Sequence, residues 1–198
     1  MPQGMTALDE DEGPEGRERG SRGLPPLVRE ALILVAVVIA ASAFRAFVAE
    51  PYVIPTESMA PTIPVGSVCL GIKGPLWGEG PVRGAVISFV DPRDGKTTLV
   101  KRVVATAGDT VDLEDGQLVV NGRVMEEPYT QGVTAQLGGG IQFPYTVPKG
   151  ELFVMGDNRE NSLDSRAFGG VGLNMVDSVI GVRLTPWPPE SLSQNREP

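Results

Sequence analysis

Histidine is absent from this 198-residue chain, and its absence restricts the chemistry that the chain can perform. Without an imidazole, the sequence cannot build a Ser-His catalytic pair, and the common histidine-containing metal sites are excluded. Cysteine occurs once, at Cys69, which excludes an internal disulfide framework and a cysteine-based zinc site. A metal held by carboxylates alone is left, but no spacing of acidic residues indicates one. We therefore expect neither a metal nor a cofactor.

Positive charge is also scarce. The chain carries 17 Lys and Arg against 25 Asp and Glu, a net charge of −8, and no basic cluster stands out. A nucleic-acid partner is therefore not expected. Long helical periods are missing after residue 50, whereas 25 glycines and 18 prolines are present. This composition is typical of a domain made of turns and short strands.

One long apolar run lies near the N-terminus. From Ala31 to Ala49, the only polar residues are Ser42 and Arg45. In a helix this run rises about 28 Å, close to the thickness of the hydrocarbon core of a bilayer. We expect a transmembrane helix over 27–49, preceded by a disordered cytoplasmic tail over 1–26 that is rich in Gly, Pro and charged residues. A cleaved signal peptide, with the small residues 41–43 at its cleavage site, and a buried core helix are the alternatives.

The arginines before the apolar run predict its orientation. Arg17, Arg19, Arg22 and Arg29 precede the span, and positively charged flanks stay in the cytoplasm. The N-terminus is then cytoplasmic, the chain crosses the cell membrane once, and the residues after Glu50 lie outside. A domain in that location with a single cysteine depends on its hydrophobic core, because it cannot form internal disulfides.

After residue 50 the pattern changes to short apolar, β-branched runs separated by turns. The runs include SVCLGIK, AVISFV, TTLVKRVVATA, ELFVMGD and VIGVRL, and the turns include DPRDGK and VPKG. The segment LEDGQLVVNGRV carries two turn signals and indicates a hairpin. We predict one mainly β domain of barrel or Greek-key type over 50–186, with a smaller loop-rich β excursion over 112–150. Residues 187–198 are expected to form a flexible tail.

A serine follows the apolar run closely, in the stretch PTESMAPTI over 55–63. Ser58 is a candidate nucleophile, but a serine hydroxyl reacts only when a neighbouring base takes its proton. In a chain without histidine, the candidate bases are Asp, Glu, Tyr and Lys. A lysine can serve where burial lowers its pKa, because desolvation disfavours the charged form.

Lys101 is the lysine whose surroundings suit this role. Lys73, Lys96 and Lys149 stand in sequences typical of exposed turns, whereas Lys101 lies inside the apolar run TTLVKRVVATA. Arg102 cannot substitute, because a guanidinium does not deprotonate in proteins. Two plainer interpretations stay open: a lysine that snorkels from a sheet edge, and a serine that stabilises a proline-rich turn.

A polar segment, MGDNRENSLDSR over 155–166, follows the apolar strand ELFVM. By itself it predicts either an exposed loop or a partly buried hydrogen-bond network beside a cleft. The order of the apolar run, EPYVIPTESMAPTI, VKRVVATAGD and GDNRENSLDSR resembles the type I bacterial signal peptidases, membrane-bound serine proteases with a Ser–Lys dyad. The resemblance covers roughly residues 31–184 and is strongest to the short forms with one membrane span.

The resemblance implies a role for each matching residue. Ser58 is the nucleophile, and Lys101 is the general base that later protonates the leaving amine. The oxyanion is held by the backbone N–H of Ser58 and the hydroxyl of Thr56, while Ser162 orients the lysine. The structural network around the site is implied at Asp157, Arg159, Asp164 and Arg166. Shallow apolar pockets for small residues at −1 and −3 are implied at Tyr52, Ile54, Met59, Ile63 and Val100.

Two departures from the family pattern remove no catalytic group. Glu57 stands where a small residue often precedes the nucleophile, which changes the charge at the mouth of the cleft. The stretch FGGVG over 168–172 has glycines where prolines are common, which loosens the segment after the last motif.

The expected function is removal of N-terminal signal peptides from exported preproteins, after small residues at −3 and −1. The expected partners are these preproteins, the lipid bilayer and, nearby, the secretion translocon. Ser58 follows Ala49 by nine residues, so a fully extended linker spans about 30 Å at most, and Pro51 and Pro55 stiffen it. A nucleophile held this close to the bilayer suits a substrate whose cleavage site emerges from the membrane.

Two other functions compete with this prediction. One is a Ser–Lys peptidase that cleaves itself, which would carry a soluble or DNA-binding module where this chain has an apolar run. The other is a non-enzymatic, membrane-anchored β domain that binds a partner. A penicillin-type acyl enzyme is not expected, since no Ser-x-x-Lys occurs, and a sortase would need both Cys and His.

Overall fold

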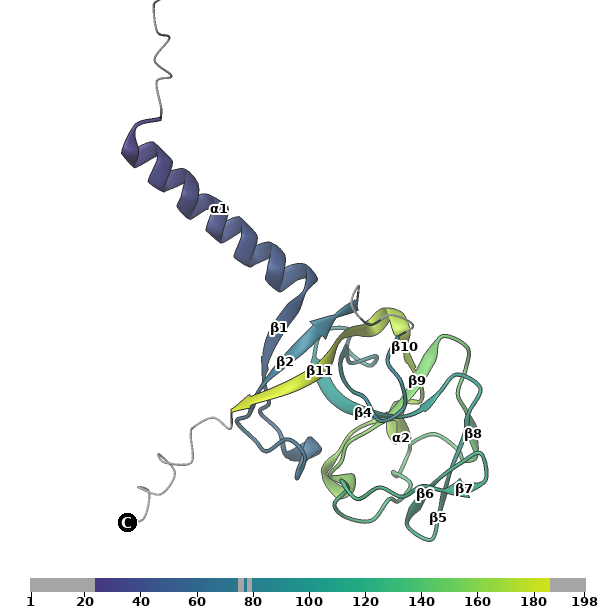
Figure 1. Ribbon diagram of the computed structural model, residues 1–198. Helices are drawn as coiled ribbons and strands as arrows, with labels where there is room; N and C mark the ends of the chain where they lie inside the picture. The colour runs from purple at the N-terminus through teal and green to yellow at the C-terminus, as the bar shows by residue number, and fades with distance from the viewer. Residues whose placement is uncertain (1–23, 75–76, 78–79, 186–198) are drawn as a thin grey trace, which may run out of the picture. The chain divides into compact units, whose positions relative to one another are not determined.

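The computed structural model describes residues 24–74, 77 and 80–185 (Figure 1). Within this part of the chain, the regular structure consists of one long helix, two antiparallel sheets and several short helical turns. The tail predicted over 187–198 lies outside the described residues, and so do residues 1–23 of the tail predicted over 1–26.

The apolar run near the N-terminus forms helix α1, Pro26–Phe47. Proline suits the first helical position, because its missing N–H would have no partner there. Within the described ranges, α1 is the one helix long and apolar enough to cross a membrane, judged by length and composition. None of its residues is buried, so the alternative of a core helix has no support.

The helix ends two residues before the predicted boundary of 27–49. Its last turn closes with the hydrogen bond from Val48 N to Phe44 O at 2.8 Å, and Ala49 already begins strand β1, Ala49–Val53. The reason is tertiary: β1 pairs antiparallel with β2, Val68–Lys73, from Ala49↔Ile72 to Val53↔Val68. Pro51 is tolerated there because β1 is the edge strand of its sheet.

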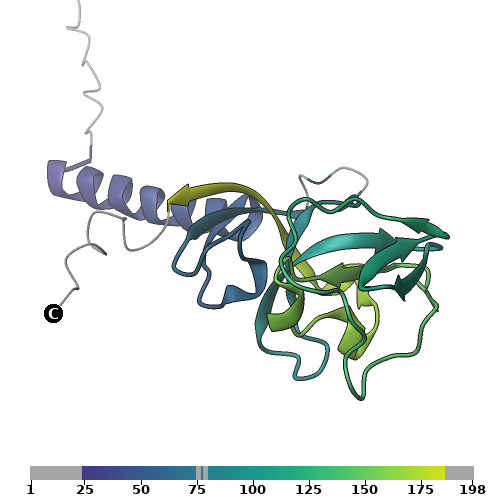
Figure 2. The same ribbon diagram turned by 90° about the horizontal axis from the view of Figure 1, so that it is seen from below.

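The large sheet has seven strands in the order β1-β2-β11-β3-β4-β9-β10. Its further strands are β3 Val86–Val90, β4 Thr98–Thr106, β9 Glu151–Met155, β10 Val171–Gly172 and β11 Val176–Thr185. Register shifts interrupt β11 against β2 and β3, and β4 against β9. Such bulges increase the local twist, and the sheet curls into a half-barrel (Figures 1 and 2). This confirms the predicted mainly β domain.

The small sheet has four strands in the order β7-β6-β5-β8: β5 Thr110–Glu114, β6 Gln117–Val120, β7 Arg123–Val124 and β8 Tyr145–Thr146. The two turns of the segment LEDGQLVVNGRV lie at Asp115–Gly116 and Asn121–Gly122, where all four φ angles are positive. Tight hairpins favour such residue pairs, because Asn, Asp and Gly tolerate this backbone region. The sheet begins at Thr110, two residues before the predicted excursion over 112–150.

Short helical elements connect the strands. They are the 3₁₀ turns η1 Glu57–Met59, η3 Arg159–Asn161 and η4 Leu173–Met175, and the one-turn helix α2 Ser165–Phe168. The side chain of Asp164 caps α2 by accepting from Arg166 N. The three 3₁₀ turns each follow a strand closely, and α2 is joined to β9 by the hydrogen bond from Val154 N to Ser165 Oγ at 2.9 Å, so the sheet fixes their positions.

Strands β4 and β9 lie between two hydrophobic cores. One face of the pair packs on the small sheet, where Val104 and Phe153 join residues of β5 and β6. The opposite face, with Val103 and Val154, packs against β3 and the segment after α2. Because both faces are covered, β4 is held rigidly, and this strand carries Lys101.

Candidate active site

The segment around Ser58 is held in place by apolar anchors. Ile54, Met59, Ile63 and Cys69 form one buried cluster, and Met59 is completely buried. Backbone hydrogen bonds fix the same segment, from Ile54 N to Ser67 O at 3.0 Å and from Ile63 N to Met59 O at 2.8 Å. The single turn of η1 between these anchors presents Ser58 beside β4.

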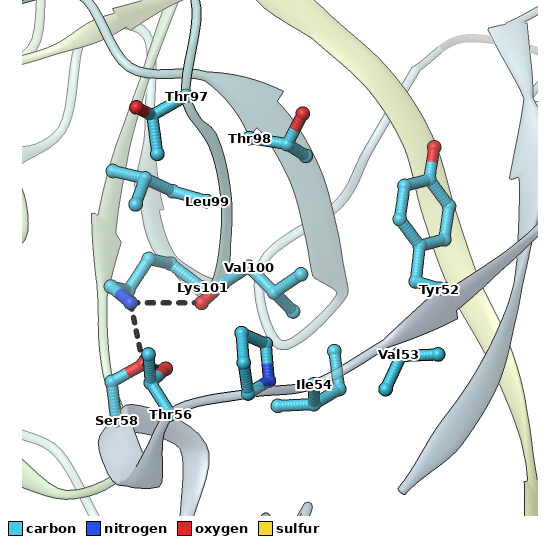
Figure 3. A pocket seen from close by; sticks show the side chains of 11 residues that line it. Tyr52, Val53, Ile54, Thr56, Ser58, Thr97, Thr98, Leu99, Val100 and Lys101 are labelled. Atoms are coloured by element: carbon cyan, nitrogen blue, oxygen red, sulfur yellow. Dashed lines mark hydrogen bonds between the residues drawn. The ribbon is translucent and has the colours of Figure 1, made fainter. Parts of the chain in front are cut away.

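Lys101 reaches Ser58 from the middle of β4. Its side chain is 3% exposed, and its Nζ lies 2.7 Å from Ser58 Oγ (Figure 3). The same Nζ donates to the carbonyl oxygen of Val100 at 3.0 Å. The strand is paired with β3 at Ile87↔Lys101, so the backbone of the lysine cannot shift away from the serine without breaking the sheet.

The surroundings of Lys101 favour its neutral form. Burial lowers the pKa of Lys101 to about 8, although the negative charges of Asp164, Asp157 and Asp91 act in the opposite direction. A neutral amine can accept the proton of a serine hydroxyl, whereas an ammonium cannot. The predicted apolar environment of this lysine is therefore present.

Lys73 differs from its predicted setting in an exposed turn. It is the last residue of β2, and its Nζ contacts Glu50 Oε2 at 2.7 Å and Asp177 Oδ1 at 2.8 Å. Burial alone would lower the pKa of Lys73, but the hydrogen bonds to Asp177 and Glu50 outweigh it and raise the pKa. Lys73 therefore stays charged and is unsuited to act as a base.

Two donors are available for an oxyanion beside Ser58. The N–H of Ser58 belongs to the first turn of η1, where backbone donors have no partner within the helix. The hydroxyl of Thr56 lies 3.3 Å from Ser58 Oγ. The structure thus brings together the three residues assigned to nucleophile, base and oxyanion.

The polar segment over 155–166 forms a buried network behind the serine. Asn158 N donates to the carbonyl oxygen of Ser58 at 3.1 Å, and Gly156 N donates to Asp164 Oδ2 at 3.0 Å. Arg166 binds the two oxygens of Asp164 at 2.9 Å each, and both residues are buried. Of the two alternatives that the sequence left open, the hydrogen-bonded network is the one present.

The other two residues of the predicted network pair with partners outside the segment. Asp157 accepts from Arg102 Nε at 2.8 Å and Nη2 at 2.6 Å. Arg159 donates to the two oxygens of Glu127 at 2.7 and 2.8 Å. Glu127 was not predicted, because it stands in a loop-rich stretch that matches none of the three motifs.

Ser162 is placed near Ser58 but has no hydrogen bond to Ser58 or Lys101. Its Oγ is buried and has no hydrogen-bond partner within the part of the chain described. A Cβ added to Gly156 would lie 2.2 Å from this Oγ and 2.5 Å from the carbonyl oxygen of Ser58. The lack of a side chain at Gly156 therefore lets the segment approach Ser58. The lysine-orienting role of Ser162 stays a prediction.

A cavity of about 250 Å³ opens beside Ser58 and Lys101. Its walls are two extended segments, 52–56 with Ser58 on one side and 97–101 on the other (Figure 3). Residues 98–100 pair with β3 along one edge, while β9 pairs with β4 only from Arg102 onward. The other edge of this half of β4 thus faces the cavity and leaves backbone groups for an added strand.

The cavity contains some of the predicted pocket residues and not others. Tyr52, Ile54 and Val100 line it, whereas Met59 and Ile63 lie in the buried cluster around η1 and are absent from the lining. A contact of those two with substrate stays a prediction. The lining residues that sequence reasoning missed are Val53, Pro55, Thr97, Thr98 and Leu99. Val53 and Pro55 lie within the first motif and the other three directly precede the second, but only the tertiary structure shows that the two segments face each other.

Several known proteins are similar to this chain. The sequence model of the family described as "Signal peptidase, peptidase S26" matches residues 27–187. Signal peptidase I U of Bacillus subtilis (strain 168) is 35% identical over 161 residues, which cover 78% of this chain and 84% of that protein. Signal peptidase I of Mycobacterium tuberculosis (strain CDC 1551 / Oshkosh) is 35% identical over 213 residues, covering 80% of this chain and 72% of that protein. A crystal structure of a signal peptidase I from Enterococcus faecalis V583 is 34% identical and aligns with a TM-score of 0.43 over 51% of this chain and 97% of that chain.

Proposed function

This chain belongs to the signal peptidase family, peptidase S26, and is therefore a peptidase that removes signal peptides; from this membership we infer that it works through a dyad of Ser58 and Lys101. The observation that supports the dyad most directly is the distance of 2.7 Å between Lys101 Nζ and Ser58 Oγ, with the lysine 3% exposed. A buried lysine beside a serine gives a serine peptidase without histidine a base for its nucleophile.

The dyad performs acyl transfer in two halves. Neutral Lys101 accepts the proton of Ser58 as Oγ attacks the carbonyl carbon of the substrate residue at −1. The oxyanion that forms is held by the N–H of Ser58 and the hydroxyl of Thr56. The lysine ammonium then gives its proton to the leaving amine, which is the N-terminus of the mature protein. Water, deprotonated by Lys101, finally hydrolyses the acyl ester and frees Ser58.

The substrate binds as an extended strand between the two walls of the cavity. The free edge of residues 98–100 supplies backbone hydrogen bonds, and the apolar side chains of Ile54 and Val100 leave room for small residues. Side chains at −1 and −3 point to the same side of an extended strand, because strand side chains alternate with a period of two. A cavity of about 250 Å³ suits two small side chains, which supports a preference for alanine-like residues at both positions.

Helix α1 anchors the peptidase in the cell membrane as a single span. It has 22 residues and a mean hydropathy of 2.2, enough to cross the hydrocarbon core. The arginines that precede it keep the N-terminus cytoplasmic, so the β domain lies outside, where exported preproteins emerge near the translocon. The partners of this domain are thus the preproteins and the bilayer surface.

Cleavage of a preprotein with an Ala-x-Ala site tests this function. The full-length wild type in detergent is expected to cut after the alanine at −1, and mass spectrometry of the new N-terminus identifies the bond. Ser58→Ala is expected to leave no cleavage above background, because the nucleophile is missing. Equal cleavage by both proteins would assign the activity to another site or a contaminant. A folded wild type that cuts no preprotein would favour the non-enzymatic binding domain.

The rate should rise with pH as Lys101 loses its proton. Because the pKa of Lys101 in the folded protein is about 8, kcat/KM is expected to increase about tenfold for each pH unit below that value and to level off above it. The measurement is the initial rate of peptide cleavage between pH 6 and pH 10, with folding checked at each pH by circular dichroism. A profile that stays flat across this range would exclude a lysine base.

A further inference from the structure

Asp177, the second residue of β11, is connected to the cavity through Tyr52. The hydroxyl of Tyr52 donates to Asp177 Oδ2. The other carboxylate oxygen, Oδ1, accepts from Lys73 Nζ at 2.8 Å, and Lys73 also binds Glu50, two residues before the tyrosine in β1. One polar network therefore joins β1, β2 and β11 at the end of the cavity.

The ring of Tyr52 crosses β2 at a position that has no side chain. A Cβ added to Gly71 would lie 2.6 Å from Tyr52 Cε2 and 2.0 Å from Ser178 Oγ. Behind the ring, Ser178 and Ser88 share a hydrogen bond of 2.7 Å between their hydroxyl groups, and both are completely buried. The sheet thus confines the ring, and the Tyr52 hydroxyl donates to Asp177 while it also interacts with the hydroxyl groups of Ser178 and Ser88.

Tyr52 stands at the far end of the cavity from the catalytic pair. Figure 3 shows its ring on the side opposite Ser58 and Lys101, beside the ribbon of β11. A residue at −3 of an extended substrate lies about 7 Å from the residue at −1, away from the nucleophile and on the same face. The position of this ring therefore determines how much space the −3 side chain finds.

We propose that Asp177 is a positioning residue for substrate selection, which holds the hydroxyl of Tyr52 and so fixes the ring as the wall that limits the side chain accepted at −3. The proposal rests on the function proposed above, because it assumes that a preprotein occupies the cavity. It concerns a residue outside the three motifs, at the start of the last strand.

The charges in the network keep this contact in place at neutral pH. Burial and the hydrogen bond to Asp177 raise the pKa of the Tyr52 hydroxyl, which therefore remains protonated and can donate. Burial would raise the pKa of Asp177, but the hydrogen bonds from Lys73 and Tyr52 outweigh it and lower the pKa. An ionised carboxylate between a phenol and an ammonium makes stronger hydrogen bonds than a neutral acceptor.

The test compares substrate preference in full-length variants. Peptides with Ala, Val or Leu at −3 and Ala at −1 are cleaved by wild type, Asp177→Ala and Asp177→Asn, and a second peptide series varies −1 alone. A single methylene in an apolar pocket is worth about 10–200-fold in kcat/KM, so we expect Asp177→Ala to reduce the preference for Ala over Leu at −3 about tenfold. The change should appear in KM, with the preference at −1 retained. Asp177→Asn, which keeps an acceptor oxygen, should retain part of the preference.

Control variants separate positioning from general damage. Tyr52→Phe removes only the hydroxyl, and it should relax the −3 preference as Asp177→Ala does, with no further relaxation in the double variant. Asp112→Asn, in the small sheet, should leave both preferences unchanged. An Asp177→Ala enzyme with wild-type preference at −3, or one that loses rate equally on every peptide, would overturn the proposal.

A second readout does not depend on activity. The chain has three tyrosines, so ¹³C labelling at their Cζ atoms gives three signals, and Tyr52→Phe identifies the one in question. In Asp177→Ala, this signal should move and titrate at lower pH than in wild type, because the carboxylate that raises the pKa of the Tyr52 hydroxyl is removed. A signal that does not respond would overturn the positioning of the ring. If the wild type cleaves no peptide but the Tyr52 signal still moves in Asp177→Ala, the proposed function and the selection role are overturned. The contact between Tyr52 and Asp177 is then established by itself.

Discussion

Lys101→Met and Lys101→Arg are both expected to lose at least about 10⁴-fold in kcat/KM on a preprotein, the scale of loss seen when a nucleophile or its base is removed. Methionine fills the same space without a basic nitrogen. Arginine keeps the positive charge, but its guanidinium does not deprotonate and cannot accept the proton of Ser58. Single-turnover cleavage followed by mass spectrometry has the range to measure such a loss.

The stability of Lys101→Met provides the control for folding. The pKa of Lys101 falls from an ordinary 10.5 to about 8 in the folded protein, because the lysine is buried. Between these two values the unfolded chain binds more protons than the folded one, so stability rises with pH across this window. Below pH 8, the buried ammonium costs the folded state roughly 3 kcal/mol, since one pKa unit corresponds to about 1.4 kcal/mol. Lys101→Met removes this cost and should unfold at a higher temperature than wild type at pH 7.

This pairing of effects distinguishes a catalytic lysine from a structural one. An inactive Lys101→Met protein that is more stable than wild type has lost chemistry and kept its fold. Substantial cleavage by Lys101→Arg would remove the lysine from the mechanism. A Lys101→Met protein less stable than wild type at pH 7 would show that the ammonium is compensated by its acidic neighbours, and the pKa shift would then have to be small.

Gly156→Ala is expected to reduce kcat/KM by about 100-fold or more, the size of loss that a 1 Å misplacement of reacting groups produces. The added Cβ would lie 2.5 Å from the carbonyl oxygen of Ser58 and 2.2 Å from Ser162 Oγ. Atoms cannot remain so close, and the oxygen belongs to the backbone of the nucleophile itself. Either η1 or the segment over 155–166 must move. A shift of η1 displaces Ser58 from Lys101, and a shift of the segment breaks the hydrogen bond from Asn158 N that holds the carbonyl oxygen of Ser58.

Gly138→Ala is the matched control, which shows whether the loss of activity depends on the position of the added methyl group. Gly138 lies in the loop of the excursion, and a Cβ added to it would meet no atom within 4 Å. Gly138→Ala should therefore keep wild-type activity and thermal stability, whereas Gly156→Ala should also lose about 1–3 kcal/mol of unfolding free energy through overpacking. The measurements are peptide cleavage and urea unfolding of the full-length variants. Wild-type activity in Gly156→Ala would mean that the segment over 155–166 does not support the nucleophile.

Some predictions from the sequence depended on local patterns, and these agree with the structure. The β-branched runs became strands, and the pairs Asp115–Gly116 and Asn121–Gly122 became hairpin turns, because their conformations are set by neighbouring residues. Lys101 was singled out by the apolar residues around it, and it is buried. The same local reasoning failed for Lys73. Its neighbours in the sequence indicated an exposed turn, but its partners Glu50 and Asp177 are 23 and 104 residues away along the chain.

The sequence by itself determined which chemistry was available. The lack of histidine excluded the usual Ser–His pair, and the apolar run around Lys101 set this lysine apart, while its pairing with Ser58 was implied by the resemblance to the signal peptidases. The tertiary structure decided the distances and the partners: the 2.7 Å contact between Lys101 and Ser58, the pairing of Arg159 with Glu127, and the placing of Tyr52 against Asp177. The reason is physical. Residue types and short patterns act over a few positions, whereas contacts across 32 to 125 residues depend on the pairing of strands and the packing of the cores between them.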